Sequence, residues 1–453
     1  MNLPNYFIAD LPPEASLTAS LVTEAAQALK QNRAKYLAQR PTKALVETLC
    51  AVGQGWLSRG NAFRTMTLEQ SASIGFSRET LAVGLDSFFK QLTPENFNAL
   101  LEQDLGHSQR LDKLAISKPE EKTNRAAIAT APELIAQIGA GTLPVSVLQT
   151  MVLGVLLRSA QFIKCASGST LVPRLFAHSL YEADPKLGAC VEVAEWRGGA
   201  AELEQALFAE SDCLVAAGTD ETLAAIRQRL PVRTRLVAHG HKVSFAFVAG
   251  RALTRFGGNK VINRAAQDVA AWNQLGCLSP HVIYVDNAGE MSPEEFAEKL
   301  AQELMGREAV DPRGELPVNL SATIASRRAF YEVRAAHSPG TRVWASPGST
   351  AWTVVYEDDA RFQASCLNRF IYVKAVRSLR EALEGADSVR GRVSTIGLAA
   401  PEDEAPEIAH AMARWGATRI CPLGQMQAPS LLWRHDGRPS LADLVTWTDF
   451  EFS

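Results

Sequence analysis

The sequence predicts an α/β protein with a helix-rich N-terminal region, and two observations carry this prediction. From Leu17 to about Leu105 apolar residues recur at helical spacing, and Thr93-Pro94-Glu95 has the cap and proline of a helix start. Beyond a charged stretch, apolar runs alternate with amphipathic segments, which is the pattern of βαβ units around a parallel sheet.

Five short apolar runs in the middle of the chain are expected to be strands. They read QFIKCAS, ACVEVAEW, DCLVAA, RLVAHG and VSFAFVAG, and helices such as TDETLAAIRQRL separate some of them, as in half of a doubly wound domain. After Asn259 a further α/β unit begins with the helical segment NKVINRAAQDVAAW and the strand HVIYV. The next helix is expected to start at a capping box opened by Ser292 and to end at Gly306.

These patterns divide the chain into four segments. We expect a helix-rich region over 1–120 that packs on the following domain, a first α/β domain over 121–250, a second over 251–430 and a C-terminal segment over 431–453. A chain of 453 residues with 47% hydrophobic residues has the material for two or three substantial cores.

Composition excludes several classes of function. The net charge of -3 and the scattered basic residues argue against a nucleic-acid partner. No segment reaches the ~18 uninterrupted apolar residues of a membrane span, and the N-terminus lacks a secretory pattern, so we expect a cytoplasmic protein. The seven cysteines include no CxxC pair, which indicates neither a disulfide framework nor a zinc site. Most should be buried thiols.

One turn in the middle region carries the pattern of a phosphate site. DCLVAAGTDETLAAI runs from an apolar strand through Gly218 and Thr219 into a helix. Backbone N–H groups and the positive end of a helix could there bind a pyrophosphate. The same residues also fit an ordinary strand-to-helix turn with Thr219 as the N-cap, and the sequence leaves both interpretations open.

A second position of interest is Cys277, in WNQLGCLSPHVIYVD. A lone cysteine between a helix and a strand is usually a small buried apolar residue. Here Gly276 would let the backbone approach a ligand, and Pro280 rules out continuation of the helix, so the thiol sits at a junction of elements. A thiolate at such a place could attack an acyl carbon and hold a thioester.

Together these motifs resemble the aldehyde dehydrogenase superfamily, and within it the acyl-CoA reductase branch, the fatty-acid reductases of bacterial luminescence systems. NQLGCLSPHVIYV is similar to the nucleophile motif of that branch, and the C-terminal RICPLGQMQAPSLLWRHDGRPSLADLVTWTDFE is similar to its end. The resemblance covers roughly residues 135–453. It implies an aldehyde dehydrogenase-like fold, with a Rossmann-type cofactor domain over 121–250 and a catalytic domain over 251–430 that carries Cys277.

The resemblance also implies the cofactor residues. RSAQFIKCAS is similar to the strand whose lysine contacts the cofactor ribose, which is Lys164 here, and Gly218 and Thr219 fall at the superfamily's cofactor turn. Ser167 stands where that family often has an acidic residue. Because no carboxylate at this position would repel a 2′-phosphate, the resemblance implies NADPH as the cofactor, with NADH as the alternative.

Further residues are matched to the chemistry of the superfamily, with departures. Thr142 in GAGTLPVSVL stands in place of the asparagine that supports the oxyanion, and Ala238 in LVAHGHKVSF stands in place of the water-activating glutamate. His239 and His241 could assist proton transfer, or could fill a strand end. Asn273 could hydrogen-bond near the nucleophile, although a helix end needs such a group in any case.

The activity that this resemblance implies is NADPH-dependent reduction of an acyl thioester, on CoA or on a carrier, to an aldehyde through a cysteine acyl-enzyme, with no metal. Two other interpretations stay open. The chain could be a non-catalytic dehydrogenase-like subunit that binds a partner such as an acyl-protein synthetase, which Thr142 favours. It could also be an ordinary NAD-linked dehydrogenase in which the cysteine is structural. The superfamily resemblance implies a homo-oligomer.

Overall fold

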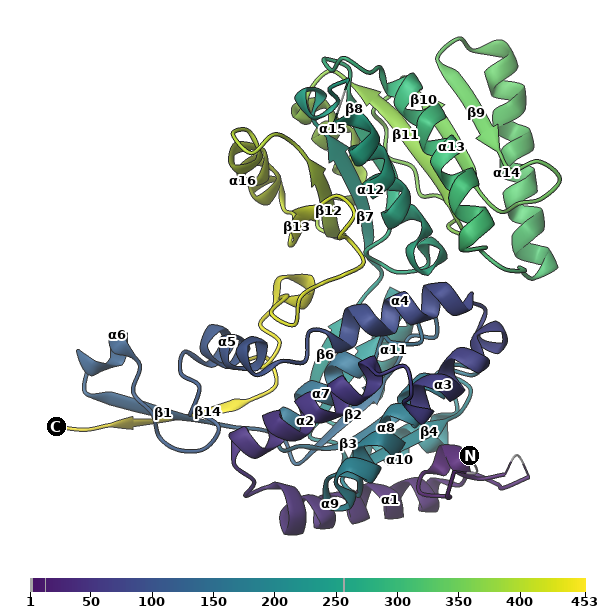
Figure 1. Ribbon diagram of the computed structural model, residues 1–453. Coiled ribbons are helices and arrows are strands. Elements are labelled where there is room, and N and C mark those ends of the chain that lie inside the picture. The colour runs from purple at the N-terminus through teal and green to yellow at the C-terminus, as the bar shows by residue number, and fades with distance from the viewer. Residues whose placement is uncertain (1–2, 13, 256) are drawn as a thin grey trace. The chain divides into compact units, whose positions relative to one another are not determined.

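The computed structural model describes residues 3–12, 14–255 and 257–453. The chain divides into two compact units, which are considered separately (Figure 1). The first unit consists of Met1–Gln70, Leu85–Gly240 and Ser430–Ser453, and the second of Ser71–Gly84 and His241–Pro429. The main divisions therefore fall after Gly240 and after Pro429. The short stretch Ser71–Gly84, from the helix-rich region, also belongs to the second unit.

The first unit is built on a five-stranded parallel sheet with the order β4-β3-β2-β5-β6. Its strands are β2 Leu134–Ile138, β3 Ala160–Cys165, β4 Val191–Glu195, β5 Cys213–Ala217 and β6 Arg235–His239. The order reverses between β2 and β5, as in Rossmann-type sheets, whose ligands bind outside the carboxyl ends of the strands at that reversal. The central strand β2 is not among the five strands expected from the sequence.

Helices cover this sheet on both faces, as expected for a doubly wound domain. The helices of this unit are α1 Ala19–Asn32, α2 Thr42–Leu57, α3 Ala62–Glu69, α5 Pro94–Leu105, α6 Lys118–Glu121, α7 Leu148–Leu156, α8 Leu171–Ala183, α9 Pro185–Gly188, α10 Ala201–Glu210 and α11 Asp220–Arg229, and α4 Arg78–Phe89 crosses the division between the units. Of these, α6 contacts β1 rather than the five-stranded sheet. Val22 of α1 packs in one cluster with Phe162 of the sheet and Phe208 of α10. The Thr93 hydroxyl accepts from the Asn96 amide (3.3 Å), so the predicted start of α5 is confirmed.

A two-stranded antiparallel ribbon completes the first unit. It pairs β1 Arg125–Thr130 with β14 Thr446–Glu451, close to the C-terminus. Every residue of β14 is exposed, including Trp447 and Phe450.

The second unit is built on a seven-stranded sheet with the order β13-β12-β7-β8-β11-β10-β9, parallel except for the pair of β9 with β10. Its strands are β7 Val243–Val248, β8 Pro280–Asp286, β9 Thr341–Ala345, β10 Thr353–Glu357, β11 Phe370–Val376, β12 Val393–Ala399 and β13 Ile420–Pro422. The expectation that VSFAFVAG belongs to the first α/β domain is wrong, because β7 pairs with β8 and β12. Strands buried on both faces all read as apolar runs, so such a run does not specify its sheet.

Helices of the second unit form the two outer layers of its sheet. They are α12 Gly258–Ala270, α13 Pro293–Val310, α14 Val318–His337, α15 Leu379–Gly385 and α16 Ala405–Trp415. The Ser292 hydroxyl accepts from the Glu295 amide (3.1 Å), which confirms the predicted cap. The predicted end at Gly306 is wrong, because α13 continues to Val310. A glycine inside a helix costs only about 1 kcal/mol, which the packing of the rest of the helix outweighs.

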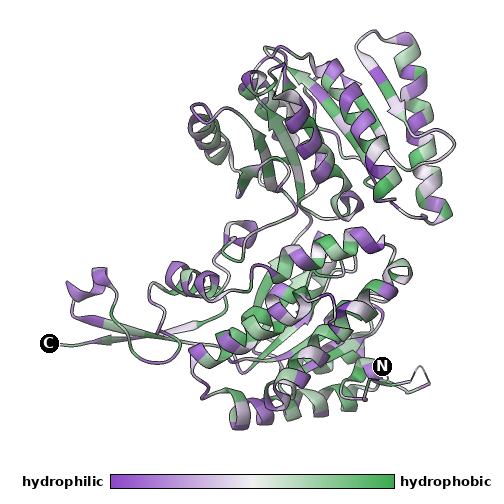
Figure 2. Cartoon of the chain, viewed as in Figure 1, coloured by the Kyte–Doolittle hydropathy of each residue, from purple (hydrophilic) through white to green (hydrophobic). Residues whose placement is uncertain are grey.

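Hydrophobic residues concentrate in the sheets, and hydrophilic residues lie on the helices that cover them (Figure 2). In Figure 2 the strands of both sheets are mostly green, whereas the helices carry purple residues along their outer faces. The second unit has two apolar clusters, one with α12 and α13 and the other with α14 and α16. Among the described residues, no helix is long and apolar enough to cross a membrane.

Candidate functional site

A left-handed turn precedes Cys277. Trp272, Asn273 and Gln274 have φ angles of 52°, 52° and 64°. Three successive non-glycine residues in this region are rare, because the Cβ atom crowds the backbone, at roughly 1–2 kcal/mol per residue. The sequence predicted only the end of a helix here. Such a turn persists where its surroundings over-determine it.

Trp272 anchors the first residue of this turn. Its ring packs edge-on against Phe76, with ring centroids 5.3 Å apart. The ring also lies over Gly84 of α4, where an added Cβ atom would come within 1.9 Å of it. Gly84 is therefore required for the indole to occupy its site.

Hydrogen bonds anchor the other two residues. The amide group of Asn273 donates to the Arg313 carbonyl (3.1 Å), and that of Gln274 donates to the Pro280 carbonyl (2.7 Å). Both side chains are buried. Asn273 thus fixes the turn to the segment after α13, in addition to any role near the nucleophile.

Exposure distinguishes Cys277 from the other cysteines. It is exposed, whereas Cys165, Cys190 and Cys213 are buried. Burial is the main cause that raises the pKa of each of these three thiols to about 12. At neutral pH they are therefore protonated and poor nucleophiles. Cys421 is also buried and Cys50 and Cys366 are half-buried, so Cys277 is the most accessible thiol.

The backbone around Cys277 is held by neighbouring strands and loops. The Ser244 hydroxyl of β7 donates to the Cys277 carbonyl (2.7 Å). The amide of Gln427 donates to the Ser279 hydroxyl and fills the space beside Gly276. The absence of a side chain at Gly276 thus makes room for Gln427. From the sequence we expected this glycine to let the backbone approach a ligand instead.

Thr142, Lys164 and Ser167 lie at the carboxyl ends of neighbouring strands in the first unit. Thr142 is exposed in the turn after β2, and the Gly139 amide at the start of that turn donates to the Lys164 carbonyl of β3 (3.1 Å). The Lys164 side chain is buried, with its ammonium 6.0 Å from the centre of the Trp196 ring. Burial lowers the pKa of Lys164, and nearby carboxylates, Glu204 foremost, act in the opposite direction.

A carboxylate that the sequence interpretation missed lies next to Ser167. Glu195, the last residue of β4, accepts from the Gly168 amide (3.0 Å) and from the Thr170 hydroxyl (2.7 Å). The strand register pairs Glu195 with Cys165. An acidic residue at the end of the neighbouring strand was the available signal, but it required the strand order to be known.

In the turn at Gly218 and Thr219, the Gly218 amide and the Thr219 hydroxyl form hydrogen bonds within the protein. The Thr219 hydroxyl accepts from the Thr222 amide (3.3 Å), so Thr219 is the N-cap of α11. The Gly218 amide donates to the His239 carbonyl (3.2 Å). This one amide is therefore already bonded, as in the ordinary strand-to-helix turn that the sequence left open, and α11 begins at the carboxyl end of β5.

His239 belongs to a cluster with two residues from the C-terminal segment. Its Nδ1 atom lies 2.9 Å from the Asp436 carboxylate, and its ring stacks on His435 with centroids 3.9 Å apart. The ligand atoms of these three side chains all lie within 4.8 Å of one another, a spacing that a metal ion could bridge. Arg438 donates to the Ala238 carbonyl beside them (2.7 Å).

His241 is the first residue of a segment of the second unit, whereas His239 belongs to the first unit. The described neighbour of His241 is His281 of β8. Burial, followed by the charge of His241, lowers the pKa of His281 to about 4. His281 is thus neutral near pH 7, with Nδ1 accepting from the Ser365 amide (3.1 Å).

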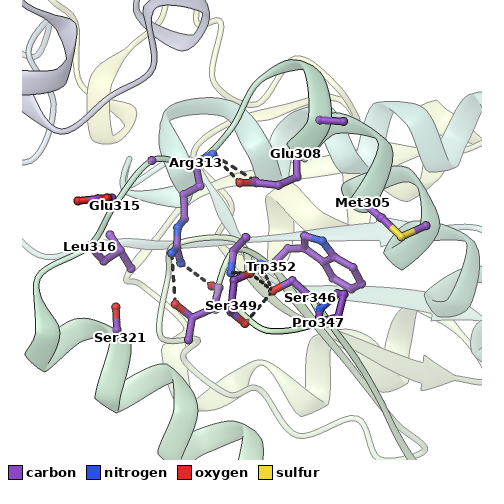
Figure 3. A pocket seen from close by; sticks show the side chains of 14 residues that line it. Met305, Glu308, Arg313, Glu315, Leu316, Ser321, Ser346, Pro347, Ser349 and Trp352 are labelled. Atoms are coloured by element: carbon purple, nitrogen blue, oxygen red, sulfur yellow. Dashed lines mark hydrogen bonds between the residues drawn. The ribbon is translucent and has the colours of Figure 1, made fainter.

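A separate pocket of about 770 Å³ lies in the second unit (Figure 3). Its lining includes Glu308 and Arg313 near the end of α13, and Thr350 and Trp352 before β10. Arg313 donates to the Thr350 hydroxyl (3.2 Å). None of the site residues predicted from the sequence is among the described residues that line it.

The family is decided by comparison with known proteins. Residues 37–447 match the family described as acyl-CoA reductase (LuxC). The chain belongs to this family. The chain also matches a curated relative, the long-chain acyl-protein thioester reductase of Vibrio harveyi, with 21% identity over 315 residues. That match covers 69% of this chain and 63% of the relative, so the chain spans less than two thirds of the relative's length.

Solved structures agree on the fold of this acyl-CoA reductase family member. A benzaldehyde dehydrogenase from Corynebacterium glutamicum matches with a TM-score of 0.69 at 12% identity, over 96% of this chain and 91% of that one. A lactaldehyde dehydrogenase matches with a TM-score of 0.67 at 14% identity, over 96% and 92%. A bifunctional proline utilization A protein matches with a TM-score of 0.70 at 16% identity, over 96% of this chain and 45% of that one. The predicted aldehyde dehydrogenase-like fold is confirmed.

Proposed function

We propose that this protein reduces an acyl thioester, either an acyl-CoA or a carrier-bound acyl group, to an aldehyde through an acyl-enzyme on Cys277. The observation that carries this proposal is an exposed thiol three residues after a strained left-handed turn, in a chain of the acyl-CoA reductase family. Strained backbone of this kind clusters at functional sites. An acyl donor can reach an exposed thiol but not the buried ones.

The reaction follows from thiolate chemistry. The Cys277 thiolate attacks the thioester carbonyl carbon, a new S–C bond forms, and the bond to the carrier sulfur breaks, so that the carrier leaves as a thiol after taking up a proton. The reduced nicotinamide, when bound, supplies a hydride to the acyl carbon. The resulting thiohemiacetal reforms its carbonyl, breaks the S–C bond and releases the aldehyde. We assign the oxyanion contact to Thr142 and its neighbouring amides, and proton transfer to His239 and His241.

We infer that the cofactor is NADPH, with NADH as the alternative. The reversal of strand order between β2 and β5 supports a dinucleotide site in the first unit. Lys164 would hold the ribose hydroxyls, and the start of α11 at Gly218 and Thr219 would face the pyrophosphate. Ser167 carries no charge against a 2′-phosphate, whereas the Glu195 carboxylate, held by the two hydrogen bonds that it accepts, would disfavour that phosphate and is the reason for the NADH alternative.

The donor and the assembly are further parts of the proposal. The name of the Vibrio harveyi relative specifies an acyl-protein thioester, which supports a protein-bound acyl group, delivered by an acyl-protein synthetase, beside acyl-CoA. A homo-oligomer is supported by the exposed strand β14, because its outer edge can pair with a second chain.

The deciding experiment is acylation of purified protein with a long-chain acyl-CoA, followed by mass spectrometry and by aldehyde detection after addition of NADPH. Wild type should carry one adduct on Cys277, and Cys277→Ala should lose both adduct and aldehyde, while Cys213→Ala and Cys366→Ala keep them. Acylation that persists in Cys277→Ala would overturn the proposal. A wild type that forms no adduct at all would instead favour a non-catalytic subunit.

A further inference from the structure

A chain of hydrogen bonds connects the backbone of Cys277 to Arg419, the residue before β13. The Ser244 hydroxyl, which donates to the Cys277 carbonyl, accepts from the Thr395 amide of β12 (3.1 Å). The Thr395 hydroxyl accepts in turn from Nη1 of Arg419 (3.3 Å). Ser244 and Thr395 are fully buried, so this connection is shielded from water and its geometry is fixed by three neighbouring strands.

A second connection reaches Cys277 from the other side. Arg419 donates to the carbonyls of Met426 (2.7 Å) and Gln425 (3.0 Å), which folds the loop after β13 back on itself. Gln427 follows directly, and its amide lies against Gly276 and donates to the Ser279 hydroxyl. One guanidinium therefore holds both the strand that fixes the Cys277 carbonyl and the loop that packs on the preceding residue.

Arg419 interacts electrostatically with three groups that can become anions. Burial lowers the pKa of Arg419, while Cys421 of β13, Asp268 of α12 and Cys277 act in the opposite direction. Burial raises the pKa of Cys421 to about 11, so its thiol is neutral at neutral pH. Burial likewise raises the pKa of Asp268 to about 7, and its carboxylate also accepts from the amides of Gly424 and Met426. Neither group therefore fully neutralises the guanidinium, and Cys277 is the exposed member of the three.

We propose that Arg419 is a positioning residue for the nucleophile, which holds the Cys277 turn from both sides and supplies the positive charge that stabilises its thiolate. The inference rests on the proposed role of Cys277 and adds a means of activating it. Deprotonation transfers the thiol proton to water and changes no other bond. A cation next to a thiolate is a general way to make a cysteine reactive. The planar fork of an arginine can also bind Thr395 and the loop carbonyls at once, which a lysine cannot.

The test is the pH dependence of Cys277 alkylation by iodoacetamide, followed on the Cys277 peptide by mass spectrometry without acyl donor or cofactor. Arg419→Gln should move the midpoint of the profile upward by about 1 pH unit or more, the scale of one lost neighbouring charge. Arg419→Lys should stay within about half a unit of wild type, because it keeps the charge, while its kcat falls through lost positioning. Arg328→Gln is the matched control, since Arg328 is also buried and also holds a loop through carbonyls, and its midpoint should equal that of wild type.

An unchanged midpoint in a folded Arg419→Gln protein would overturn the inference. Folding is judged by whether buried Cys213 stays unalkylated. If Arg419→Gln unfolds, Arg419→Lys decides alone, since a midpoint near that of wild type supports the role of the charge and a rise of a full unit or more contradicts it. A wild type whose Cys277 alkylates normally but never accepts an acyl group would contradict the proposed function instead, so the two failures are distinguishable.

Discussion

The side-chain amide of Gln427 lies where a Cβ atom on Gly276 would have to be, within 2.7 Å of its Nε2 and 2.8 Å of its Oε1. A loop that follows β13 thus fixes the residue before Cys277. Real Cβ atoms do not approach other atoms so closely, so any side chain at this position must displace Gln427, and with it the hydrogen bond to Ser279. The turn that carries Cys277 therefore depends on a contact between residues far apart in the sequence.

Gly276→Ala should reduce the rate of Cys277 acylation by about tenfold or more, because misplacement of a reacting group by about 1 Å can cost up to 100-fold. The measurement is single-turnover acylation by an acyl-CoA. Gly276→Ala combined with Gln427→Ala should recover part of the rate. Gly306→Ala is the control, since nothing lies within 4 Å of a Cβ at that helical position, and it should leave acylation unchanged. Equal rates in wild type and Gly276→Ala would contradict the importance of this contact.

Cofactor preference should respond in opposite directions to two changes of charge, one at Ser167 in the loop after β3 and one at Glu195 at the end of β4. Ser167→Glu adds a negative charge and should shift the ratio of kcat/KM values toward NADH. Glu195→Gln removes one and should shift the ratio toward NADPH, each by at most ~1.5–3 kcal/mol, the scale of one hydrogen bond to a charged group. The assay is aldehyde formation with either cofactor. If neither ratio moves, the cofactor ribose does not lie near these two side chains.

The fate of the acyl-enzyme should depend on Ala238. A positioned carboxylate activates water by typically ~10²- to 10⁴-fold, and alanine cannot do so. Wild type given acyl-CoA without reduced cofactor should therefore release free acid slowly, and Ala238→Glu should raise the ratio of acid to aldehyde. A wild type that hydrolyses acyl-CoA as fast as it reduces it would mean that another base, with His239 and His241 first, serves the site.

Stability should fall in mild acid because of His281. Its pKa is about 4 in the folded protein, mainly through burial, and 6.5 is the ordinary value, so the unfolded chain binds the proton first. The stabilising contribution is complete above pH 6.5 and is lost as pH falls toward 4, by up to about 3 kcal/mol. His281→Asn, whose Oδ1 can accept from the Ser365 amide, should flatten this part of the profile of unfolding free energy against pH. His337 is exposed, so the control substitution His337→Asn should leave this part of the profile unchanged.

The sequence by itself determined the features that depend on neighbours along the chain. The α/β class followed from the alternation of apolar runs and amphipathic helices. The caps at Thr93, Thr219 and Ser292 followed from side chains that bond to amides three residues away. Cys277 was singled out by the residues on either side of it and by the motif that they form. Such signals are readable because the interacting groups lie within one turn of each other.

Only the tertiary structure decided the features that join distant segments. It assigned β7 to the seven-stranded sheet, brought Glu195 of β4 beside Ser167, and set Arg419 and Gln427 around the turn at Cys277. Local propensity opposes the left-handed φ angles of residues 272–274, which the packing of Trp272 and the buried hydrogen bonds of the next two residues impose. The physical reason is that strand order and buried contacts depend on the packing of the whole domain, which no short stretch of sequence encodes.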